Sequence, residues 1–371
     1  MQKLAQIVWF LLLAAFLFLA FVTCGGSGGG GTAARLGGDD DDDSATADDD
    51  NDVSGDDDDN DNDDDNDDAT SDDDDDDDAT PTWTAMNVPA NNGLESIWGA
   101  SATDVFTVSL DGEILYYDGS AWSIMSSVGA VLWGVWGLSS TAVFAVGDQD
   151  QTPSPSAIVH YDGATWSPIP CPDAGILSAV WGSSSSDVFA AGDQATILHY
   201  DGSTWAATHA GFSAESAFTS VWGASATDVY AVSSQLFHYD GSSWSAVAGI
   251  PFGGDYWGVG GTSASNVFAL GHWWTPDDGA IIHYDGSSWS CATGGGPGID
   301  FEAVWESSPS DVFVVGGLGH EPGAGAILHF DGSTWSPMPC TEKADVTSIW
   351  GASPTDVFAV SADGRILHYG Y

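Results

Sequence analysis

From Trp83 onward, short apolar runs rich in β-branched and aromatic residues alternate with Gly, Asp and Ser. Runs of this length with such boundaries predict β-strands joined by tight turns. One unit shows the pattern in residues 221–223 (Val-Trp-Gly), 228–230 (Asp-Val-Tyr), 238–241 (His-Tyr-Asp-Gly) and Trp244. Each of these four landmarks falls in its own run, so the unit predicts four strands.

The Trp-Gly landmark recurs at spacings of 38 to 45 residues, with Gly replacing Trp in one copy. Its seven positions are Trp98, Trp136, Trp181, Trp222, Gly260, Trp305 and Trp350. Four-stranded units at this period are typical of propeller blades, because radial repetition limits exposed sheet edges. We therefore expect an all-β fold in which residues 81–371 form a single seven-bladed β-propeller with four-stranded blades.

The two ends of the repeat region indicate how the ring closes. Six units carry a Trp on the fourth strand, whereas the last unit ends at Tyr371 without one. The missing copy lies at the other end, where residues 82–86 (Thr-Trp-Thr-Ala-Met) are similar to residues 334–338 (Thr-Trp-Ser-Pro-Met). The sequence thus predicts that the N-terminal strand around Trp83 completes the last blade as its outer strand.

These units resemble the YVTN/BNR-like, WD-repeat-type β-propeller repeats that are found in bacterial surface lipoproteins. The resemblance covers Trp83 to Tyr371 and implies the fold, but it implies little about activity because propellers host many unrelated functions. It also implies that the repeated His residues bond to Asp within their own blades, as in WD-repeat networks. The His residues at this position are His160, His199, His238, His283, His329 and His368, and the matching Asp residues are Asp104, Asp187, Asp228, Asp311 and Asp356. Ala142 and Asn266 depart from this pattern.

The N-terminal segment predicts a cellular location rather than an element of the fold. Residues 1–23 carry Lys3 ahead of an apolar run, as a signal peptide does. Residues 21–24 (Phe-Val-Thr-Cys) resemble a bacterial lipobox, which implies that residues 1–23 are a lipoprotein signal peptide and that Cys24 is lipidated. The resemblance implies a lipid-anchored protein of the bacterial cell envelope, surface-exposed on the outer membrane. An uncleaved membrane anchor and simple secretion are the alternatives, since the run is near the lower length limit for spanning.

Two further segments separate this anchor from the repeats. Residues 24–38 form the lipidated Cys and a Gly-rich tether, and residues 39–80 form an Asp-rich spacer with 26 Asp between positions 39 and 78. Such a tract cannot bury enough apolar surface to offset its ordering entropy, so we expect a disordered stalk. Its carboxylates could bind Ca²⁺ weakly and diffusely, but they lack the spacing of an EF-hand loop.

Charge and motifs restrict the function. The net charge is −51, and beyond residue 80 the only cations are Lys343 and Arg365, so nucleic acid is excluded as a partner. No nucleophile motif or phosphate loop is present, and no Cys spacing suggests a zinc site, so we expect no metal and no cofactor. We expect a monomeric, non-enzymatic recognition or scaffold lipoprotein that binds a glycan or protein ligand on one propeller face. The alternative is a polysaccharide-active hydrolase that uses a pair of carboxylates.

The departures from the repeat predict where a ligand binds. Connections from the second to the third strand, and from the fourth strand to the next blade, vary in length and should share one face of the ring. Insertions occur at residues 148–155, 272–278 and 317–325, and the last two belong to the neighbouring blades five and six. Loops on a rigid scaffold commonly carry recognition, and adjacent exposed Trp residues favour a binding surface. The candidate ligand-binding residues are His272, Trp273, Trp274, Asp277, Asp278, His320 and Glu321.

Overall fold

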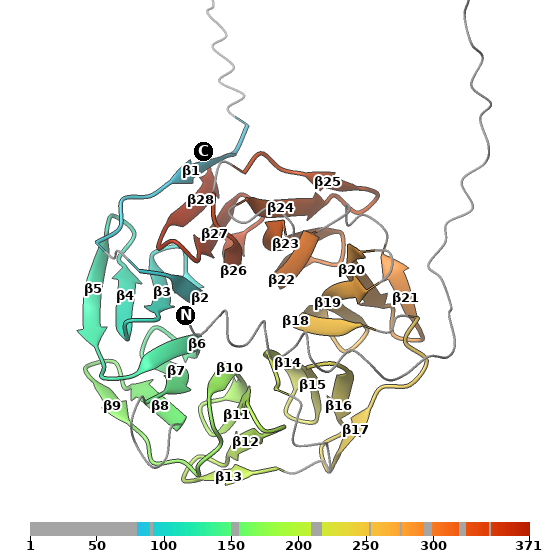
Figure 1. Ribbon diagram of the computed structural model, residues 1–371. Coiled ribbons are helices and arrows are strands. Elements are labelled where there is room, and N and C mark those ends of the chain that lie inside the picture. Colours follow the sequence, from blue (N-terminus) through green and yellow to red (C-terminus); the bar gives the residue numbers. More distant parts are fainter. Residues whose placement is uncertain are drawn as a thin grey trace, which may run out of the picture. The chain divides into compact units, whose positions relative to one another are not determined.

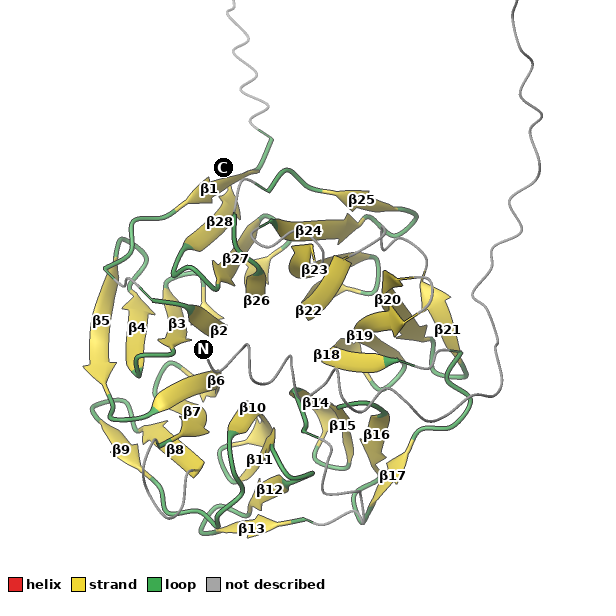
Figure 2. Ribbon diagram, in the orientation of Figure 1, coloured by secondary structure: helices red, strands yellow, loops and turns green. Residues whose placement is uncertain are grey.

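The computed structural model describes residues 80–89, 92–149, 156–208, 217–251, 254–274, 277–292, 299–318, 324–340 and 343–371. These residues form seven four-stranded antiparallel sheets arranged in a ring, and they contain no helix (Figures 1 and 2). The first strand of each sheet lies nearest the axis and the fourth lies at the rim (Figure 1). The predicted seven-bladed propeller is confirmed.

Each blade takes its strands in chain order. Blade one has β2 (Leu94–Ser101), β3 (Asp104–Ser109), β4 (Glu113–Tyr117) and β5 (Trp122–Ser127), and blade two has β6 (Val131–Ser139), β7 (Ala142–Asp148), β8 (Ser156–Tyr161) and β9 (Trp166–Pro168). Blade three has β10 (Leu177–Ser184), β11 (Asp187–Gly192), β12 (Ile197–Tyr200) and β13 (Trp205–Ala207), and blade four has β14 (Ser220–Ser225), β15 (Asp228–Val232), β16 (Leu236–Tyr239) and β17 (Trp244–Ala246). Blade five has β18 (Asp255–Ser263), β19 (Asn266–Trp274), β20 (Asp277–Tyr284) and β21 (Trp289–Ala292), and blade six has β22 (Ile299–Ser308), β23 (Asp311–Leu318), β24 (Gly325–Phe330) and β25 (Trp335–Pro337). Blade seven has β26 (Val346–Ser353), β27 (Asp356–Ser361), β28 (Ile366–Gly370) and β1 (Thr82–Ala85).

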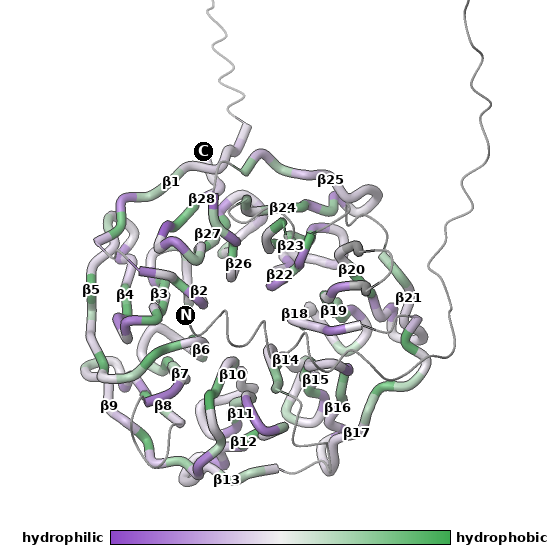
Figure 3. The backbone as a smooth tube through the Cα atoms, in the orientation of Figure 1, coloured by the Kyte–Doolittle hydropathy of each residue, from purple (hydrophilic) through white to green (hydrophobic). Residues whose placement is uncertain are grey.

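The hydrophobic core is divided among the seams between neighbouring blades. Seven clusters of buried side chains each draw their members from two adjacent blades, and hydrophobic residues lie along the strands of every blade (Figure 3). At the seam between blades two and three, the buried Phe144 ring lies 6.1 Å from the Tyr200 ring and 6.3 Å from the Trp205 ring. The landmark residues therefore bury apolar area between blades, which is the main stabilising term.

The first-strand Trp residues pack against the Gly of the Trp-Gly landmark in the next blade. A Cβ atom added to Gly137 would lie 2.6 Å from the ring of Trp98 in the preceding blade, and one added to Gly182 would lie 2.9 Å from the ring of Trp136. Such distances are too short for a side chain. The Gly of each Trp-Gly landmark is therefore required by the Trp of the preceding blade.

Ring closure occurs as the sequence predicts. Strand β1 pairs antiparallel with β28, which places Trp83 opposite Tyr369 (Figure 1). Their ring centroids are 5.3 Å apart, and the Trp83 indole N–H donates to the sulfur of Met338 at 3.5 Å. Trp83 thus occupies the place of the fourth-strand Trp in blade seven, and the unpaired edge of β28 is covered.

The repeated His and Asp residues serve blade structure. The Nε2 atoms of His199, His238 and His329 each lie 2.6 Å from the Asp of the same blade, and that of His368 lies 2.7 Å from Asp356. In blade one the hydroxyl of Tyr116 donates to Asp104 at 2.7 Å, which contributes to raising the pKa of Tyr116 to about 12. These bonds confirm the structural interpretation of the His positions.

The junction between blades five and six departs from the repeat at three linked positions. Gly260 replaces the Trp of the Trp-Gly landmark in blade five, and Glu306 replaces the Gly of that landmark in blade six. Asn266 replaces the Asp that begins the second strand in blade five. The Glu306 carboxyl group reaches into blade five and accepts a hydrogen bond from the Asn266 amide, which also donates to Thr262 Oγ1 at 2.9 Å. Asn266 Oδ1 lies 2.7 Å from His283 Nε2. A polar network therefore stands where the other junctions pack an indole on a glycine.

The predictions for the signal peptide, Cys24, the tether and nearly all of the spacer fall on residues 1–79, which lie outside the described residues. Among the described residues, no helix is long and apolar enough to cross a membrane.

Candidate functional site

The variable connections share one face of the ring. Because the strands of each sheet pair antiparallel in chain order, the connections from second to third strand and from fourth strand to next blade leave on the same side. We call this side the loop face. It holds the first-strand starts and the second-strand ends of all blades.

Four polar or aromatic side chains of blades five and six meet at this face, and we call them the His272 cluster. They are Asp255 and Trp257 on β18, His272 on β19 and Asp300 on β22. His272 Nδ1 lies 2.8 Å from Asp300 Oδ1, and the His272 and Trp257 rings stack with centroids 6.0 Å apart. Asp255 is the backbone register partner of His272. The His272 and Asp300 side chains are 19% and 27% exposed, so each presents some surface to a ligand, whereas the facing atoms His272 Nδ1 and Asp300 Oδ1 are buried.

The electrostatics of the cluster favour a ligand with positive charge or many hydrogen-bond donors. Burial raises the pKa of Asp255, and the charge of His272 opposes this rise. Arg365 lies in blade seven, where its guanidinium group is 3.3 Å from Asp363. Two carboxyl groups beside one imidazole therefore leave the site acidic.

Blade two carries a similar arrangement at the equivalent positions. Asp148 has the register position of His272, and the Trp133 indole N–H donates to Asp148 Oδ1 at 2.9 Å. Trp133 corresponds to Trp257 in the first strand. The indole and carboxylate of blade two bond to each other, whereas in blade five the Trp stacks on a His that contacts blade six.

The structure describes the predicted ligand-binding residues unevenly. His272 belongs to the cluster, whereas His320 and Glu321 lie outside the described residues. Trp273 pairs with Asp278 and Trp274 with Asp277, and of these four residues only the backbone is described. The expected insertion at residues 272–278 is thus largely a strand extension, because β19 and β20 continue their ladder to its end.

Sequence reasoning missed three members of the cluster. Asp255, Trp257 and Asp300 precede the Trp-Gly landmark of their blades, at positions that the prediction did not single out. The sequence did contain one signal for the cluster, since Trp257 lies outside the two positions at which Trp recurs in the repeat. Its proximity to Asp300 depends on the neighbouring blade and could not be read from one unit.

The described residues contain no group of three or more His, Cys, Asp or Glu side chains arranged to hold a metal ion. The cluster offers hydrogen-bond acceptors, one imidazole and an aromatic face. Such groups can orient a ligand by hydrogen bonds and stacking.

The ring of seven four-stranded blades defines the class of the chain as a seven-bladed β-propeller. No family model and no curated protein matches it. The propeller is thus confirmed by the structure, whereas the YVTN/BNR-like repeat family stays a prediction.

Solved structures with the same fold include proteins of different activity. The chain is similar to YCF48 bound to D1 peptide (TM-score 0.58, 17% identity, 78% of this chain and 97% of that chain). It is also similar to a GH74 xyloglucanase from Xanthomonas campestris (TM-score 0.60, 16% identity, 77% of this chain and 53% of that chain). A third similar structure is the WD40 β-propeller domain of Doa1 (TM-score 0.61, 11% identity, 78% of this chain and 96% of that chain). At these identities the similarity shows the fold alone.

Proposed function

We propose that this chain is a non-enzymatic recognition protein, lipid-anchored at a bacterial surface, that binds a polypeptide segment at the loop face of blades five and six. The observation that carries the proposal is the His272 cluster, where side chains outside the repeat meet across two blades. The spacer would hold the propeller away from its anchor, so that the loop face is accessible to partners.

A polypeptide with an exposed Lys or Arg fits the chemistry of the cluster. Asp255 and Asp300 supply carboxyl groups, and the Trp257 indole supplies an aromatic face for a cation. The acidity of the whole chain would attract such a partner over a longer range. A propeller bound to a peptide is already known among similar folds, in the YCF48 complex.

The hydrolase alternative has weaker support. The similar xyloglucanase has about twice the length that the two chains share, and the similarity is one of fold. Incubation of the protein with xyloglucan and other polysaccharides, followed by a reducing-sugar assay, decides between the two: release of sugars would overturn the non-enzymatic proposal.

Neutralising the cluster should weaken binding of basic peptides. We expect Asp300→Asn to lower the affinity for Lys- and Arg-containing peptides by about tenfold at low salt, because one charge-assisted contact is worth about 1.5 kcal/mol. Peptides selected from an array on the full chain, then measured by calorimetry, provide the test. Trp133→Ala, at the position of blade two that corresponds to Trp257, is the control and should bind as the wild type does.

Two outcomes would contradict the site. Basic peptides could bind the wild type and Asp300→Asn equally, or binding could fall equally in Trp133→Ala. The double variant Trp273→Ala/Trp274→Ala extends the test to the predicted Trp pair, with the melting curve recorded to separate lost binding from lost folding.

The proposed lipid anchoring at Cys24 has its own test. In the wild type expressed in a lipoprotein-processing bacterium, labelled palmitate should enter the protein, and Cys24→Ser should abolish the label because no thiol remains at that position for diacylation. Cys171→Ser is the control, since this thiol lies in the propeller. Absence of label in the wild type would show that residues 1–23 are an ordinary signal peptide or an anchor.

A further inference from the structure

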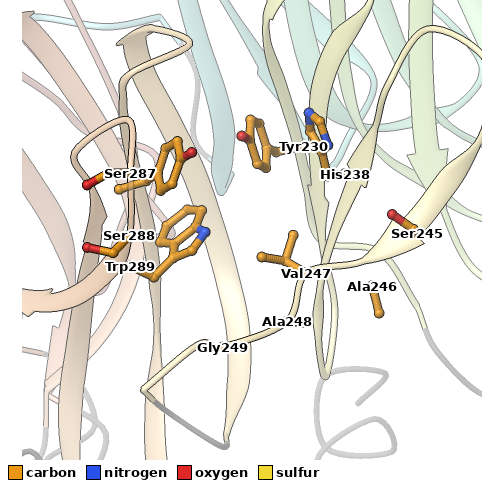
Figure 4. A pocket seen from close by; sticks show the side chains of 11 residues that line it. Tyr230, His238, Ser245, Ala246, Val247, Ala248, Gly249, Ser287, Ser288 and Trp289 are labelled. Carbon is orange, nitrogen blue, oxygen red and sulfur yellow. The ribbon is translucent and has the colours of Figure 1, made fainter.

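The seam between blades four and five contains a cavity of about 540 Å³ near the rim of the ring (Figure 4). Tyr230 and His238 of blade four form one side of it, Trp289 of blade five forms the other, and Val247 lies between them. This volume is within the range of small-molecule sites, about 300–1,000 Å³. The cavity is separate from the His272 cluster, with which it shares no residue.

Two departures from the residues of other seams adjoin this cavity, and the first concerns Val247. The position three residues after the outer Trp carries Met in three blades and Ile169, Thr208, Val247 or Ala292 in the other four. At two seams this residue is a Met whose sulfur accepts the indole N–H, with Met338 at 3.5 Å from Trp83 and Met86 at 3.3 Å from Trp122. Val247 is shorter and has no acceptor atom, so space remains beside Trp289.

The second departure is Tyr230. The other six blades have Phe at this position of the second strand, and in five of them that Phe packs against the outer Trp of the next blade. Tyr230 keeps this contact, with its ring centroid 6.1 Å from that of Trp289, and adds a hydroxyl group that points toward blade five (Figure 4). The site therefore gains a polar group at the place where the seam gains space.

The cavity also has an open mouth. Residues 247–249 connect β17 to the next blade, and Gly249 has a φ of 75°, a conformation that favours glycine. Apart from its two chain neighbours, no atom of the described residues lies within 4 Å of the position that a Cβ of Gly249 would occupy. A ligand can therefore enter beside this residue without displacing a side chain.

The lining determines the class of ligand. The lining contains no Lys or Arg. Its one imidazole, that of His238, already pairs with Asp228, with His238 Nε2 2.6 Å from Asp228 Oδ1. An anion would find no counter-charge in so acidic a protein. The Tyr230 hydroxyl, the Trp289 indole N–H and the hydroxyl of Ser245 are hydrogen-bonding groups placed among aromatic rings and Val247.

We infer that the seam between blades four and five binds a neutral pyranose sugar. Sugar hydroxyl groups can bond to the Tyr230 hydroxyl and the Trp289 N–H, while the C–H face of the ring packs on aromatic and aliphatic surface. The cavity can hold one or two pyranose rings. This inference does not rest on the proposed peptide site, since the two sites lie in different seams.

The test restores the residues of the other seams. Val247→Met should fill the space as Met338 and Met86 do elsewhere, and Tyr230→Phe should remove only the hydroxyl group. The probes are the methyl glycosides of glucose, galactose, mannose and N-acetylglucosamine and the β-1,4-linked disaccharides of glucose and N-acetylglucosamine. Binding to the full chain is followed by Trp fluorescence and by saturation-transfer NMR.

We expect at least one probe to bind the wild type saturably, and we expect Val247→Met to weaken it by about tenfold or more and Tyr230→Phe by ~5–10-fold. Both variants should melt no lower than the wild type, because each introduces the residue that other seams contain. Ile169→Met makes the same kind of change at the seam of blades two and three and should not alter binding. Asp300→Asn should also leave sugar binding unchanged.

Two results would overturn the inference. One is that no probe binds the wild type; the other is that probes bind Val247→Met and Tyr230→Phe as tightly as the wild type. If Val247→Met fails to fold, Tyr230→Phe alone decides, since Phe occupies this position in six blades.

Discussion

Removing the Trp83 side chain from the strand that closes the ring should cause a large loss of stability. We expect Trp83→Ala to lower the free energy of unfolding by about 3–5 kcal/mol, as truncation of a large packed aromatic does. The ring centroids of Trp83 and Tyr369 are 5.3 Å apart, and the Trp83 indole N–H lies 3.5 Å from the Met338 sulfur. The indole also packs into the hydrophobic cluster between blades six and seven. At about 2–4 °C per kcal/mol for a domain of this size, the melting temperature should fall by roughly 10 °C.

Deleting residues 80–89 should have a further effect that Trp83→Ala lacks. The deletion removes the backbone pairing of β1 with β28 and leaves an unpaired edge, which can pair with another copy. Calorimetry measures the stability of both variants, and light scattering detects association of the deletion variant. Thr82→Ala, on an exposed residue of the same strand, is the control. An unchanged melting curve for Trp83→Ala would contradict the closure as described.

Glu306 should make the stability of the propeller depend on pH. Burial raises its pKa to about 8 from an ordinary value of 4.5, and the hydrogen bond from Asn266 only partly opposes this rise. Its Oε1 is buried without a hydrogen-bond partner among the described residues. The neutral acid is therefore the form that the folded state favours.

The sign follows from the raised pKa. Between pH 4.5 and about 8 the folded state binds a proton that the unfolded state has lost, so stability falls as pH rises through this window. The contribution is fully present below pH 4.5 and lost above about pH 8. At 1.36 kcal/mol per pKa unit, the change is on the order of 3–5 kcal/mol.

Glu306→Gln provides the measurement. The amide keeps a similar shape and cannot ionise, so the variant should be more stable than the wild type at pH 9 by ~2–4 kcal/mol and nearly equal at pH 5. Urea unfolding at both pH values gives these free energies. In the difference between the variant and the wild type, the contribution of repulsion among the other acidic groups cancels. Parallel stability curves would contradict a buried, neutral Glu306.

A second variant checks the linkage of the junction. Gly260→Trp alone should destabilise the protein, since the new ring would meet Glu306 and Val304; a Cβ at position 260 would already lie 2.8 Å from Val304 Cγ1. Adding Glu306→Gly restores the Trp-on-Gly pair of the other junctions and should recover much of the loss. Additive effects would show that the two departures are independent.

Repeat positions and off-repeat positions have different roles in this chain. A side chain that recurs in every blade is used in packing the seams or bonding within the sheet, as Phe144 and His199 are. Its surface is therefore buried before any ligand arrives. The two candidate sites arise where blades four to six depart from the repeat and place polar groups beside aromatic rings at a seam.

The sequence by itself determined the sheets and their closure. Strand positions follow from local alternation and turn residues: the predicted landmarks at residues 221–223, 228–230 and Trp244 lie in β14, β15 and β17, and His238 and Tyr239 lie in β16. The copy of the outer strand around Trp83 predicted the pairing of β1 with β28, because the two ends carry complementary parts of one unit. The His–Asp bonds were expected from the resemblance to WD-repeat networks, in which a His and an Asp of one blade bond to each other.

Only the tertiary structure decided which residues meet between blades. His272 contacts Asp300, Glu306 bonds to Asn266, and Val247 lies beside Trp289, and each pair joins strands of adjacent blades. A repeat period specifies what each blade contains, but the contacts across a seam depend on the angle and spacing at which two blades pack. Where both partners also depart from the repeat, no recurring pair exists in the sequence, so the site emerges only when the ring is closed.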